Sequence, residues 1–598
     1  MKFNIKTFLK TYLTEFRKNW YRYLYLFVGM NFLLLLVVIP LFNWLAALVM
    51  RISGIPYLSY SNLGNLFSKH LLGVLGLFIL LILLLATVFV QFAIQFHGVR
   101  YIQQGRGRFR IVVGDSLRSL RKVSLPAFGF FLFYFLLILP FGRIVFSTPL
   151  LSKIKIPVFT FGFFTSSWQN MLILGTFYLI IFLLGSKLIF VLPSMILKEN
   201  TLKKAVQESL GLTSLKRFIY FILYFAIIGA GATALSFGVK YLLYLLQIVL
   251  DETPVEFVSA LLLLTLGNLW GMLISALAGM LLFSFLIEEL GFPLETVEAQ
   301  KKKTSIARIY RIFSAAFTLL FFLTYVASNW SYLSGAMDVV PLRISHRGVD
   351  NGNGVQNSIA ALELTAKNEP DYVEMDIQET ADQQFVVMHD ADLKALTGAA
   401  GSCQEKTLDE LLQLKVTENG KSAPVASFDD YYAAAEKLGQ ELLIEIKTSP
   451  KDSSDMLKNF VKKYGARILK NNDMVHSLDY RVITGLKKLS PKIPVSFILP
   501  INFAFPQTDA NAYTQEATTL DYDFVSQAHD DKQKVFAWTV NDRKIMERQI
   551  FNGVDGIITD RLSDLKAAIA ESEGNINYAD RLLVQFSLEP SPGDNAVN

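Results

Sequence analysis

The chain has 598 residues, of which 52% are hydrophobic and 18% charged, and it carries a formal net charge of +6. This length exceeds one ordinary domain, and the hydrophobic fraction is too high for an average soluble protein. Lysines and arginines cluster between apolar runs, as in loops that face anionic lipid, so we exclude nucleic acid as a partner. The single cysteine, Cys403, excludes an internal disulfide and suits a packing residue.

Long apolar runs are concentrated in the first 335 residues. A membrane-spanning helix needs about 20 mostly apolar residues. Stretches that pass this test lie near 23–50, 71–95, 126–146, 170–196, 218–247, 257–287 and 309–333. The first is longer than the apolar region of ~7–15 residues in a signal peptide. The sequence therefore predicts an all-α polytopic membrane domain over residues 1–335, with about seven transmembrane helices.

The connecting loops alternate in basic content. The N-terminus and the loops after the second, fourth and sixth spans are rich in Lys and Arg, whereas the other loops carry few and residues 251–256 are acidic. Basic loops tend to stay on the cytoplasmic side. We therefore expect the N-terminus inside the cytoplasmic membrane and, after seven spans, everything beyond Trp330 outside.

Two lysines, Lys187 and Lys240, fall within predicted spans. Such charges can mark a transport path or a lipid-headgroup site. We interpret them as snorkelling or bundle-facing lysines, because no acidic residue in a neighbouring span is an obvious partner. The basic stretch 101–125 fits either an interfacial helix or an ordinary cytoplasmic loop.

From Leu342 onwards, short β-rich runs alternate with amphipathic helical stretches. Eight strands with intervening helices over roughly 230 residues predict an α/β domain of the (β/α)8 TIM-barrel type. The run 384–389 follows the second strand too closely for a crossover, which indicates a hairpin arm at the barrel mouth. The predicted strands are 342–346, 372–377, 442–446, 473–477, 495–499, 522–526, 535–540 and 555–559.

The predicted domains are therefore a membrane domain (1–335), a linker (336–341), a barrel (342–570) and a weakly ordered tail (571–598). Barrel enzymes carry their catalytic groups at the C-terminal ends of the strands. Titratable residues concentrate at such positions here. They are His346 and Arg347 after the first strand, Glu374 and Asp376 in the second, His389 at the end of the hairpin arm, and Glu445 and Lys447 in the third.

Residues two apart in a strand share one face, so Glu374 with Asp376 and Glu445 with Lys447 form same-face pairs. Carboxylates that converge would repel one another unless a hard divalent cation such as Ca²⁺ or Mg²⁺ bound them. The Lys and Arg side chains suit an anionic phosphate group. Two histidines supply an acid and a base that titrate near neutrality. This inventory indicates metal-assisted phosphoryl transfer to water or to a neighbouring hydroxyl.

The barrel segment carries a series of motifs in a fixed order: Ser345-His346-Arg347-Gly348, Asn357-Ser358, Glu374-Met375-Asp376, Val387-Met388-His389-Asp390, Glu445-Ile446-Lys447, Trp538-Thr539-Val540-Asn541 and the run Gly553 to Asp560. By these motifs and their order, the chain over residues 342–568 resembles the glycerophosphodiester phosphodiesterase family. The multi-span region is similar in architecture to a membrane domain fused to some bacterial members.

The resemblance implies hydrolysis of glycerophosphodiesters to sn-glycerol 3-phosphate and an alcohol. The adjacent glycerol hydroxyl would attack, and water would open the resulting cyclic phosphate. The implied partners are a glycerophosphodiester or lipid-derived substrate and membrane lipid. By the same resemblance, Glu374, Asp376 and Glu445 bind the metal, His346 and His389 form the acid/base pair, Arg347 and Lys447 hold the phosphate, and Trp538 packs against the substrate.

One motif departs from the family. Where the family has Pro-Glu-Asn-Thr, this chain has Val355-Gln356-Asn357-Ser358, so a neutral Gln356 replaces a Glu. The replacement puts the charge balance and substrate choice in doubt. Of the remaining histidines, we interpret His529 as structural and His476 as peripheral to the site.

Two alternatives stay open at this point. The first is an enzyme of the same fold that acts on lysolipids or on glycerol-phosphate polymers of the envelope. The second is a transporter or sensor whose barrel only binds glycerophosphodiesters. An acid/base histidine pair argues against a mere binder, because binding requires no proton transfer.

Overall fold

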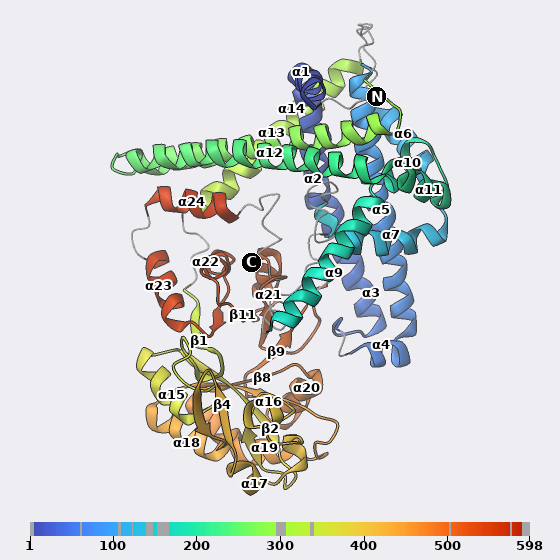
Figure 1. The fold of residues 1–598 in the computed structure, drawn as a ribbon. Coiled ribbons are helices and arrows are strands. Elements are labelled where there is room, and N and C mark those ends of the chain that lie inside the picture. The colour runs from blue at the N-terminus through green and yellow to red at the C-terminus, as the bar shows by residue number, and fades with distance from the viewer. Residues whose placement is uncertain are drawn as a thin grey trace.

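The computed structural model describes residues 5–59, 62–105, 109–121, 123–138, 148–151, 167–294, 306–334, 340–501, 504–573 and 577–588. It contains a helical N-terminal region and a barrel, which lie one above the other in Figure 1. The helical region comprises α1 (Ile5–Leu24), α2 (Met30–Leu33), α3 (Ile39–Ser53), α4 (Leu63–Lys69), α5 (Leu71–Gln103), α6 (Phe109–Leu120), α7 (Leu125–Ile138), α9 (Trp168–Lys187), α10 (Val191–Leu197), α11 (Leu202–Leu212), α12 (Leu215–Leu250), α13 (Glu256–Glu289) and α14 (Ile306–Leu333).

Within the described residues, five helical stretches are long and apolar enough to cross a membrane. They match the predicted first, second, fourth, fifth and sixth spans. The shorter apolar helix α7 begins at the predicted third span, and α14 covers the predicted seventh. Outside the described residues lie 139–147, 295–305, the loop with Lys153 and Lys155, and most of the linker. The count of seven spans therefore stays a prediction. The five qualifying stretches are Ile5–Ser53, Leu71–Gln103, Trp168–Leu197, Arg217–Leu250 and Glu256–Glu289.

Both intramembrane lysines contact the protein itself. The Lys187 ammonium donates to the backbone oxygen of Thr213 at 2.6 Å. The buried Lys240 ammonium lies 5.4 Å from the centre of the Phe586 ring. These contacts agree with bundle-facing lysines. Within the basic stretch 101–125, α6 forms a separate short helix.

Eight parallel strands close the C-terminal barrel. Neighbouring strands pair in parallel in the order β1-β12-β11-β10-β9-β8-β7-β2, and the β1–β2 pairing closes the ring. Aliphatic side chains that point outward from the strands pack under the surrounding helices as the largest core. The strands are β1 (Leu342–Ser345), β2 (Tyr372–Glu379), β7 (Leu442–Ile446), β8 (Met474–Ser477), β9 (Val495–Leu499), β10 (Ala512–Glu516), β11 (Lys534–Trp538) and β12 (Gly556–Thr559).

The sixth barrel strand differs from the prediction. Residues 522–526 belong to α21 (Tyr522–Asp530), and the strand is β10. The Asp521 carboxylate accepts from the backbone N–H of Phe524 at 3.0 Å, which caps the helix. In β10 the interior-facing residues include the polar Thr514, whose hydroxyl bonds that of Ser496 at 2.7 Å. Polar residues at interior positions hide the alternation that would reveal a strand.

The barrel helices are α15 (Ile359–Thr365), α18 (Phe428–Leu438), α19 (Met456–Asn471), α20 (Tyr480–Leu489), α21, α22 (Arg543–Phe551) and α23 (Leu562–Glu573). An insertion follows β2. Its strand β3 (Phe385–Val387) pairs antiparallel with β2, as predicted for the hairpin arm, and then with β6 (Ala426–Ser427). The antiparallel hairpin of β4 (Lys415–Glu418) and β5 (Lys421–Pro424) also belongs to it. Cys403 is buried in the apolar core of this insertion, where it is a packing residue.

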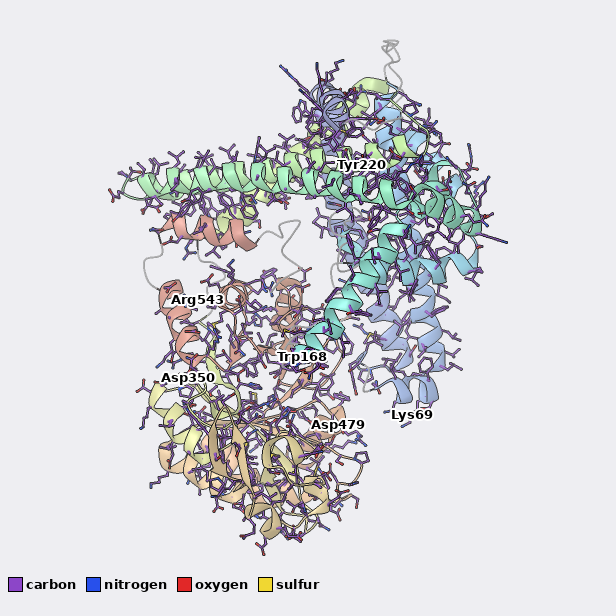
Figure 2. The ribbon with its side chains drawn as sticks, viewed as in Figure 1. Lys69, Trp168, Tyr220, Asp350, Asp479 and Arg543 are labelled. Carbon is purple, nitrogen blue, oxygen red and sulfur yellow. The ribbon has the colours of Figure 1, made fainter. Side chains whose placement is uncertain are left out.

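The helical region docks where the barrel lacks a helix. The described residues between β9 and β10 form no helix, so part of the outer face of β9 needs another cover. Tyr57, from the loop between α3 and α4, fills this position, with its ring 4.8 Å from that of Phe497 and 5.3 Å from that of Tyr480. The backbone N–H of Gln507 donates to the backbone oxygen of Pro56 at 2.7 Å. Figure 2 shows Lys69, at the end of α4, level with the barrel residue Asp479.

A second junction involves the C-terminal tail. Residues 578–588 form the helix α24 (Tyr578–Leu588), which lies beneath α12 in Figure 1. The Ala579 amide donates to the Asp251 carboxylate at 2.8 Å, and the Tyr332 hydroxyl to the Arg581 oxygen at 2.7 Å. The Phe586 ring packs so closely on Gly267 that a Cβ there would lie 2.4 Å away. This part of the predicted weakly ordered tail is therefore a packed helix, whereas residues 589–598 lie outside the described range.

The docking of Tyr57 yields a prediction. Tyr57→Ala removes a buried aromatic side chain, a change that typically costs about 3–5 kcal/mol in a core. We expect faster amide hydrogen exchange in β9 and at Gln507 of the purified full chain, with no change in α15, which follows the strand opposite β9 in the barrel. Tyr522→Ala, which truncates an exposed ring, is the matched control. Equal exchange at β9 in the wild type and the Tyr57 variant would contradict the docking.

Candidate active site

The strand alternation of β2 and β7 directs the predicted carboxylates into the barrel. Val373, Met375 and Ile377 pack outward into the main core. Glu374 and Asp376 therefore face the interior. The parallel register pairs Asp376 with Glu445 on β7, which brings the acidic residues of the two strands side by side.

Three buried side chains form a compact group at this point. Glu374, Glu445 and His476 each offer a ligand atom, and these atoms lie within 4.8 Å of one another. His476 belongs to β8, where it is paired in register with Glu445. The sequence interpretation of His476 as peripheral is wrong, because its side chain lies inside the site and is 2% exposed. A strand residue with ordinary neighbours gives no local signal of this position.

Asp376 is surrounded by positive charge. Its carboxylate lies 3.1 Å from the Lys447 ammonium and 3.7 Å from Nε of Arg347. It also accepts from the Asn357 amide at 2.8 Å. Burial alone would raise the pKa of Asp376, but Lys447 and the other neighbouring cations hold it well below its usual range. The side chain is therefore ionised, and Lys447, whose ammonium is also 2.9 Å from Glu445, joins it to the compact group.

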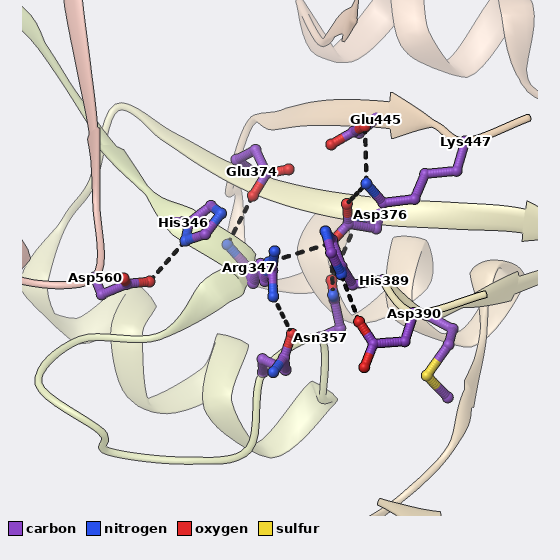
Figure 3. Close-up of polar contacts among 12 residues, drawn as sticks. His346, Arg347, Asn357, Glu374, Asp376, His389, Asp390, Glu445, Lys447 and Asp560 are labelled. Atoms are coloured by element: carbon purple, nitrogen blue, oxygen red, sulfur yellow. Dashed lines mark hydrogen bonds and ion pairs between the residues drawn. The ribbon is translucent and has the colours of Figure 1, made fainter. Parts of the chain in front are cut away.

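Arg347 is held by an unusual backbone. Its φ of 52° lies in the left-handed region, which costs free energy for a residue with a side chain. In this conformation its backbone N–H donates to the Glu374 carboxylate at 2.8 Å. The next residue, Gly348, also has positive φ, and a Cβ there would lie 2.8 Å from the Tyr431 hydroxyl. The turn thus fixes Arg347 beside the carboxylates of Glu374 and Asp376, as Figure 3 shows.

Each of the two predicted catalytic histidines is oriented by its own carboxylate. His346 Nδ1 lies 2.7 Å from Asp560, and His389 Nδ1 lies 2.8 Å from Asp390. Both rings are partly exposed. Because Nδ1 is engaged, Nε2 is the nitrogen available for proton transfer. Figure 3 shows the two imidazoles on opposite sides of Arg347.

Burial and neighbouring charges shift the pKa values of four side chains in the site. Burial opposes the charged imidazole of His346, but the Asp560 carboxylate outweighs it and raises the pKa of His346. Burial would raise the pKa of Asp560, yet the imidazole of His346 lowers it to about 2. Burial raises the pKa of Glu445 despite Lys447. Burial disfavours the Lys447 ammonium, but Asp376 and then Glu445 raise its pKa overall.

Trp538 closes one side of the interior. It ends β11 and packs, partly buried, against the apolar side chains inside the barrel. Its indole N–H donates to the backbone oxygen of Thr514 at 3.0 Å, which fixes the ring. This position at a strand end agrees with the location expected for substrate packing.

The supporting residues were not given roles by sequence reasoning. Asp560 bonds His346 across 214 residues of chain, and the Asn541 amide donates to the same carboxylate at 2.6 Å. Asp390 and Asn357 support His389 and Asp376. All of them lie inside the motif runs that carry the family resemblance, so motif position was the available signal. Only the closed barrel shows which residue each of them contacts.

Comparisons with known proteins agree with this geometry. Residues 9–326 match the family described as the membrane domain of glycerophosphoryl diester phosphodiesterase, and residues 346–563 match the glycerophosphoryl diester phosphodiesterase family. The chain belongs to this family. It is an enzyme, a glycerophosphodiester phosphodiesterase that hydrolyses glycerophosphodiesters, with a helical membrane domain ahead of its TIM barrel.

The similar proteins cover the barrel. The Bacillus subtilis (strain 168) protein YhdW, whose name as a glycerophosphodiester phosphodiesterase is provisional, is 30% identical over 36% of this chain and 93% of its own length. The glycerophosphodiester phosphodiesterase of Caldanaerobacter subterraneus subsp. tengcongensis is 27% identical over 37% of this chain and 93% of its own. A solved Oleispira antarctica phosphodiesterase in complex with sn-glycerol-3-phosphate is 22% identical over 38% of this chain and 96% of its own, with a TM-score of 0.34.

The family is metal-dependent, and the residues of this phosphodiesterase fit a divalent cation. Glu374 and Glu445 are buried carboxylates with ligand atoms close together. Burying two ionised carboxylates side by side is unfavourable without positive charge between or beside them. Lys447 contacts only one of the two, Glu445. The identity of the metal is left open by this donor set.

The departure at Gln356 has a structural explanation. The Gln356 side-chain oxygen accepts from the Arg347 guanidinium at 2.5 Å, and its amide nitrogen donates to the Glu418 carboxylate at 2.7 Å. Glu418 belongs to the inserted hairpin. A neutral amide can accept from one partner and donate to the other, whereas a carboxylate can only accept. Gln356 therefore links Arg347 to the insertion, and Glu418 supplies negative charge nearby.

This link predicts the effect of restoring the family residue. Gln356→Glu would place the new carboxylate within hydrogen-bond distance of the Glu418 carboxylate. Neither group can donate, so the hydrogen-bond link between Arg347 and Glu418 is lost. With glycerophosphocholine as substrate, we expect KM to rise roughly tenfold, or about 1–2 kcal/mol, from the loss of a charge-assisted bond. Adding Glu418→Gln restores a donor, and we expect the double variant to recover most of the loss. Equal KM values for the wild type and Gln356→Glu would show that the link does not position Arg347.

Proposed function

We propose that this protein is a metal-dependent hydrolase that converts glycerophosphodiesters into sn-glycerol 3-phosphate and an alcohol at the outer face of the cytoplasmic membrane. The observation that carries the proposal is the pair of imidazoles, His346 and His389, each oriented through Nδ1 by a carboxylate at 2.7 and 2.8 Å. Arg347 lies between them in Figure 3, and its guanidinium and the Lys447 ammonium both lie close to the buried Asp376 carboxylate. This arrangement suits proton transfer on both sides of a bound phosphodiester.

The residues divide into three roles in this proposal. Arg347 and Lys447 hold the phosphate, and Trp538 packs against the substrate. Glu374, Asp376 and Glu445 hold one Ca²⁺ or Mg²⁺ ion. Lys447 and Arg347 also offset the negative charge of Asp376. When bound, such an ion neutralises negative charge that develops on the phosphoryl oxygens.

The two histidines act in sequence. His346 carries the proton, because Asp560 favours its cationic form. It donates that proton to the oxygen of the departing alcohol. His389 accepts the proton of the glycerol hydroxyl that attacks phosphorus, and its own ring is steadied by Asp390. The roles reverse when water opens the cyclic phosphate to give sn-glycerol 3-phosphate.

The position of the barrel relative to the loops supports the outer face. Two segments from the base-poor group of loops contact it or its C-terminal helix. Pro56 and Tyr57 follow the first span, and Asp251 follows the fifth. By the positive-inside rule these segments belong outside. Because the barrel packs on the first of them, this argument does not depend on the number of later spans.

The same site could act on larger glycerophosphodiesters. Lysolipids or glycerol-phosphate polymers of the envelope share the reacting group, and a barrel attached to a membrane domain is near such substrates. Comparison of kcat/KM for glycerophosphocholine, a lysophospholipid and a glycerol-phosphate polymer decides between them. The highest kcat/KM for lysolipid or polymer would favour this second candidate.

The acid role of His346 predicts a shift in the pH profile. Asp560 raises the pKa of His346, so Asp560→Asn should lower it. A general acid works only while protonated, so we expect the alkaline limb of kcat/KM to move to lower pH. We also expect kcat to fall about 10²-fold or more, because the ring loses its orientation.

Asp555→Asn is the matched control for this experiment. Asp555 bonds His529 at 2.8 Å in another histidine–carboxylate pair, and His529 lies on α21, which agrees with a structural role. We expect this variant to keep the wild-type alkaline limb. An unmoved limb in Asp560→Asn would mean that His346 is not the acid.

The proposed orientation can be tested by thiol labelling. The sole natural thiol, Cys403, is buried, so an introduced cysteine is the main reactive site. With a membrane-impermeant maleimide, we expect intact cells to label Lys458→Cys on the barrel surface. Lys204→Cys, in a base-rich loop, should react only after the membrane is opened. The reverse pattern would place the barrel in the cytoplasm.

A further inference from the structure

His476 is buried without a hydrogen bond. Its side chain is 2% exposed, and within the described part of the chain neither ring nitrogen has a hydrogen-bond partner. Nε2 lies 3.5 Å from the Glu374 carboxylate, which is too long for an N–H···O bond. An imidazole in the interior normally satisfies at least one nitrogen, and an unsatisfied one points to a missing water or ion.

The surroundings of His476 favour an ion over a water molecule. The ring shares its small volume with Glu374 and Glu445, and the ligand atoms of all three residues lie within 4.8 Å of one another. Both of these partners are carboxylates, so a cation among the three groups would satisfy every one of them. A neutral imidazole offers a lone pair that is well suited to a divalent metal.

His476 differs in this respect from Asp376. The Asp376 carboxylate already has Asn357 and two cationic side chains around it, whereas the His476 ring lies beside the carboxylates of Glu374 and Glu445 without a hydrogen bond to any described residue. We propose that His476 is a direct ligand of the active-site cation, together with Glu374 and Glu445. This proposal rests on the metal dependence proposed above and adds a nitrogen donor to an otherwise all-oxygen site.

A nitrogen ligand changes which metals the site prefers. Ca²⁺ and Mg²⁺ favour oxygen donors, whereas Mn²⁺ and the later divalent transition metals also bind imidazole well. We therefore expect the phosphodiesterase to bind Mn²⁺ more tightly than Ca²⁺, and we expect His476 to account for that preference.

The test uses the full chain, purified in detergent and stripped of metal with a chelator. Pulsed electron paramagnetic resonance of added Mn²⁺ detects the ¹⁴N nucleus of a coordinated imidazole. We expect this ¹⁴N coupling in the wild type and its loss in His476→Gln. We also expect His476→Gln to raise the Kd for Mn²⁺ at least ~10-fold, while the Kd for Ca²⁺ changes by less than about threefold.

Two further variants make the result specific. His389→Gln removes a different imidazole near the carboxylates, and we expect it to retain the ¹⁴N coupling. His476→Asn also removes the ring and should show the same loss of ¹⁴N coupling as His476→Gln. The test therefore remains valid if one of the two variants folds poorly. Circular dichroism of each variant reports whether its fold is intact.

Failure of this inference is distinct from failure of the proposed function. Bound Mn²⁺ without ¹⁴N coupling in the wild type, or with coupling retained in folded His476→Gln, would overturn the ligand role of His476 and leave the carboxylate site in place. That result would instead fit an ion pair between a cationic His476 and Glu374. If Glu374→Gln and Glu445→Gln bind Mn²⁺ as the wild type does, the proposed metal site itself is wrong.

Discussion

The buried negative charge inside the barrel is the constraint on which the rest of the site depends. Glu374, Asp376 and Glu445 project inward from two adjacent strands, where desolvation opposes ionised carboxylates. The Lys447 ammonium neutralises part of this charge, because it lies 3.1 Å from the Asp376 carboxylate and 2.9 Å from that of Glu445. Arg347 approaches the same group from a strained turn. The cations that we propose to hold the phosphate are therefore also the groups that neutralise part of the acidic interior.

Barrel closure brings the catalytic elements together from distant parts of the chain. The pairing of β1 with β12 aligns Ser345 with Thr559, so His346 and Asp560 follow at neighbouring strand ends. Their hydrogen bond spans 214 residues of sequence. His389 and Asp390, in contrast, are adjacent in sequence and come from the inserted arm. One histidine of the proposed acid/base pair thus depends on barrel closure, and the other on the insertion that follows β2.

The membrane domain takes part in the architecture of the barrel beyond tethering it. Tyr57 packs where the described residues between β9 and β10 form no helix, and α24 returns from the barrel to α12 and α13. These two junctions lie on different sides of the barrel and restrain its orientation. The link from Glu418 through Gln356 to Arg347 extends such coupling to the substrate side of the site.

Much of this protein could be predicted from its sequence alone, because strong local patterns carry the information. Apolar runs of spanning length, the period-two placement of Glu374 and Asp376, and the motif runs determined the two-domain organisation, seven of the eight barrel strands and the family. These features depend on local composition and spacing, which the chain order preserves. The strand β10 was missed because polar residues such as Thr514 and Gln515 interrupt its apolar pattern, and the helix α21 was mistaken for it.

Only the tertiary structure decided which side chains meet. Three contacts depend on strand register and barrel closure: His476 beside Glu374 and Glu445, Asp376 with Lys447, and Tyr57 on the outer face of β9. The packing of α24 depends likewise on a distant helix pair. No local pattern encodes these contacts, because their free energy comes from groups that are close in space and far apart in sequence.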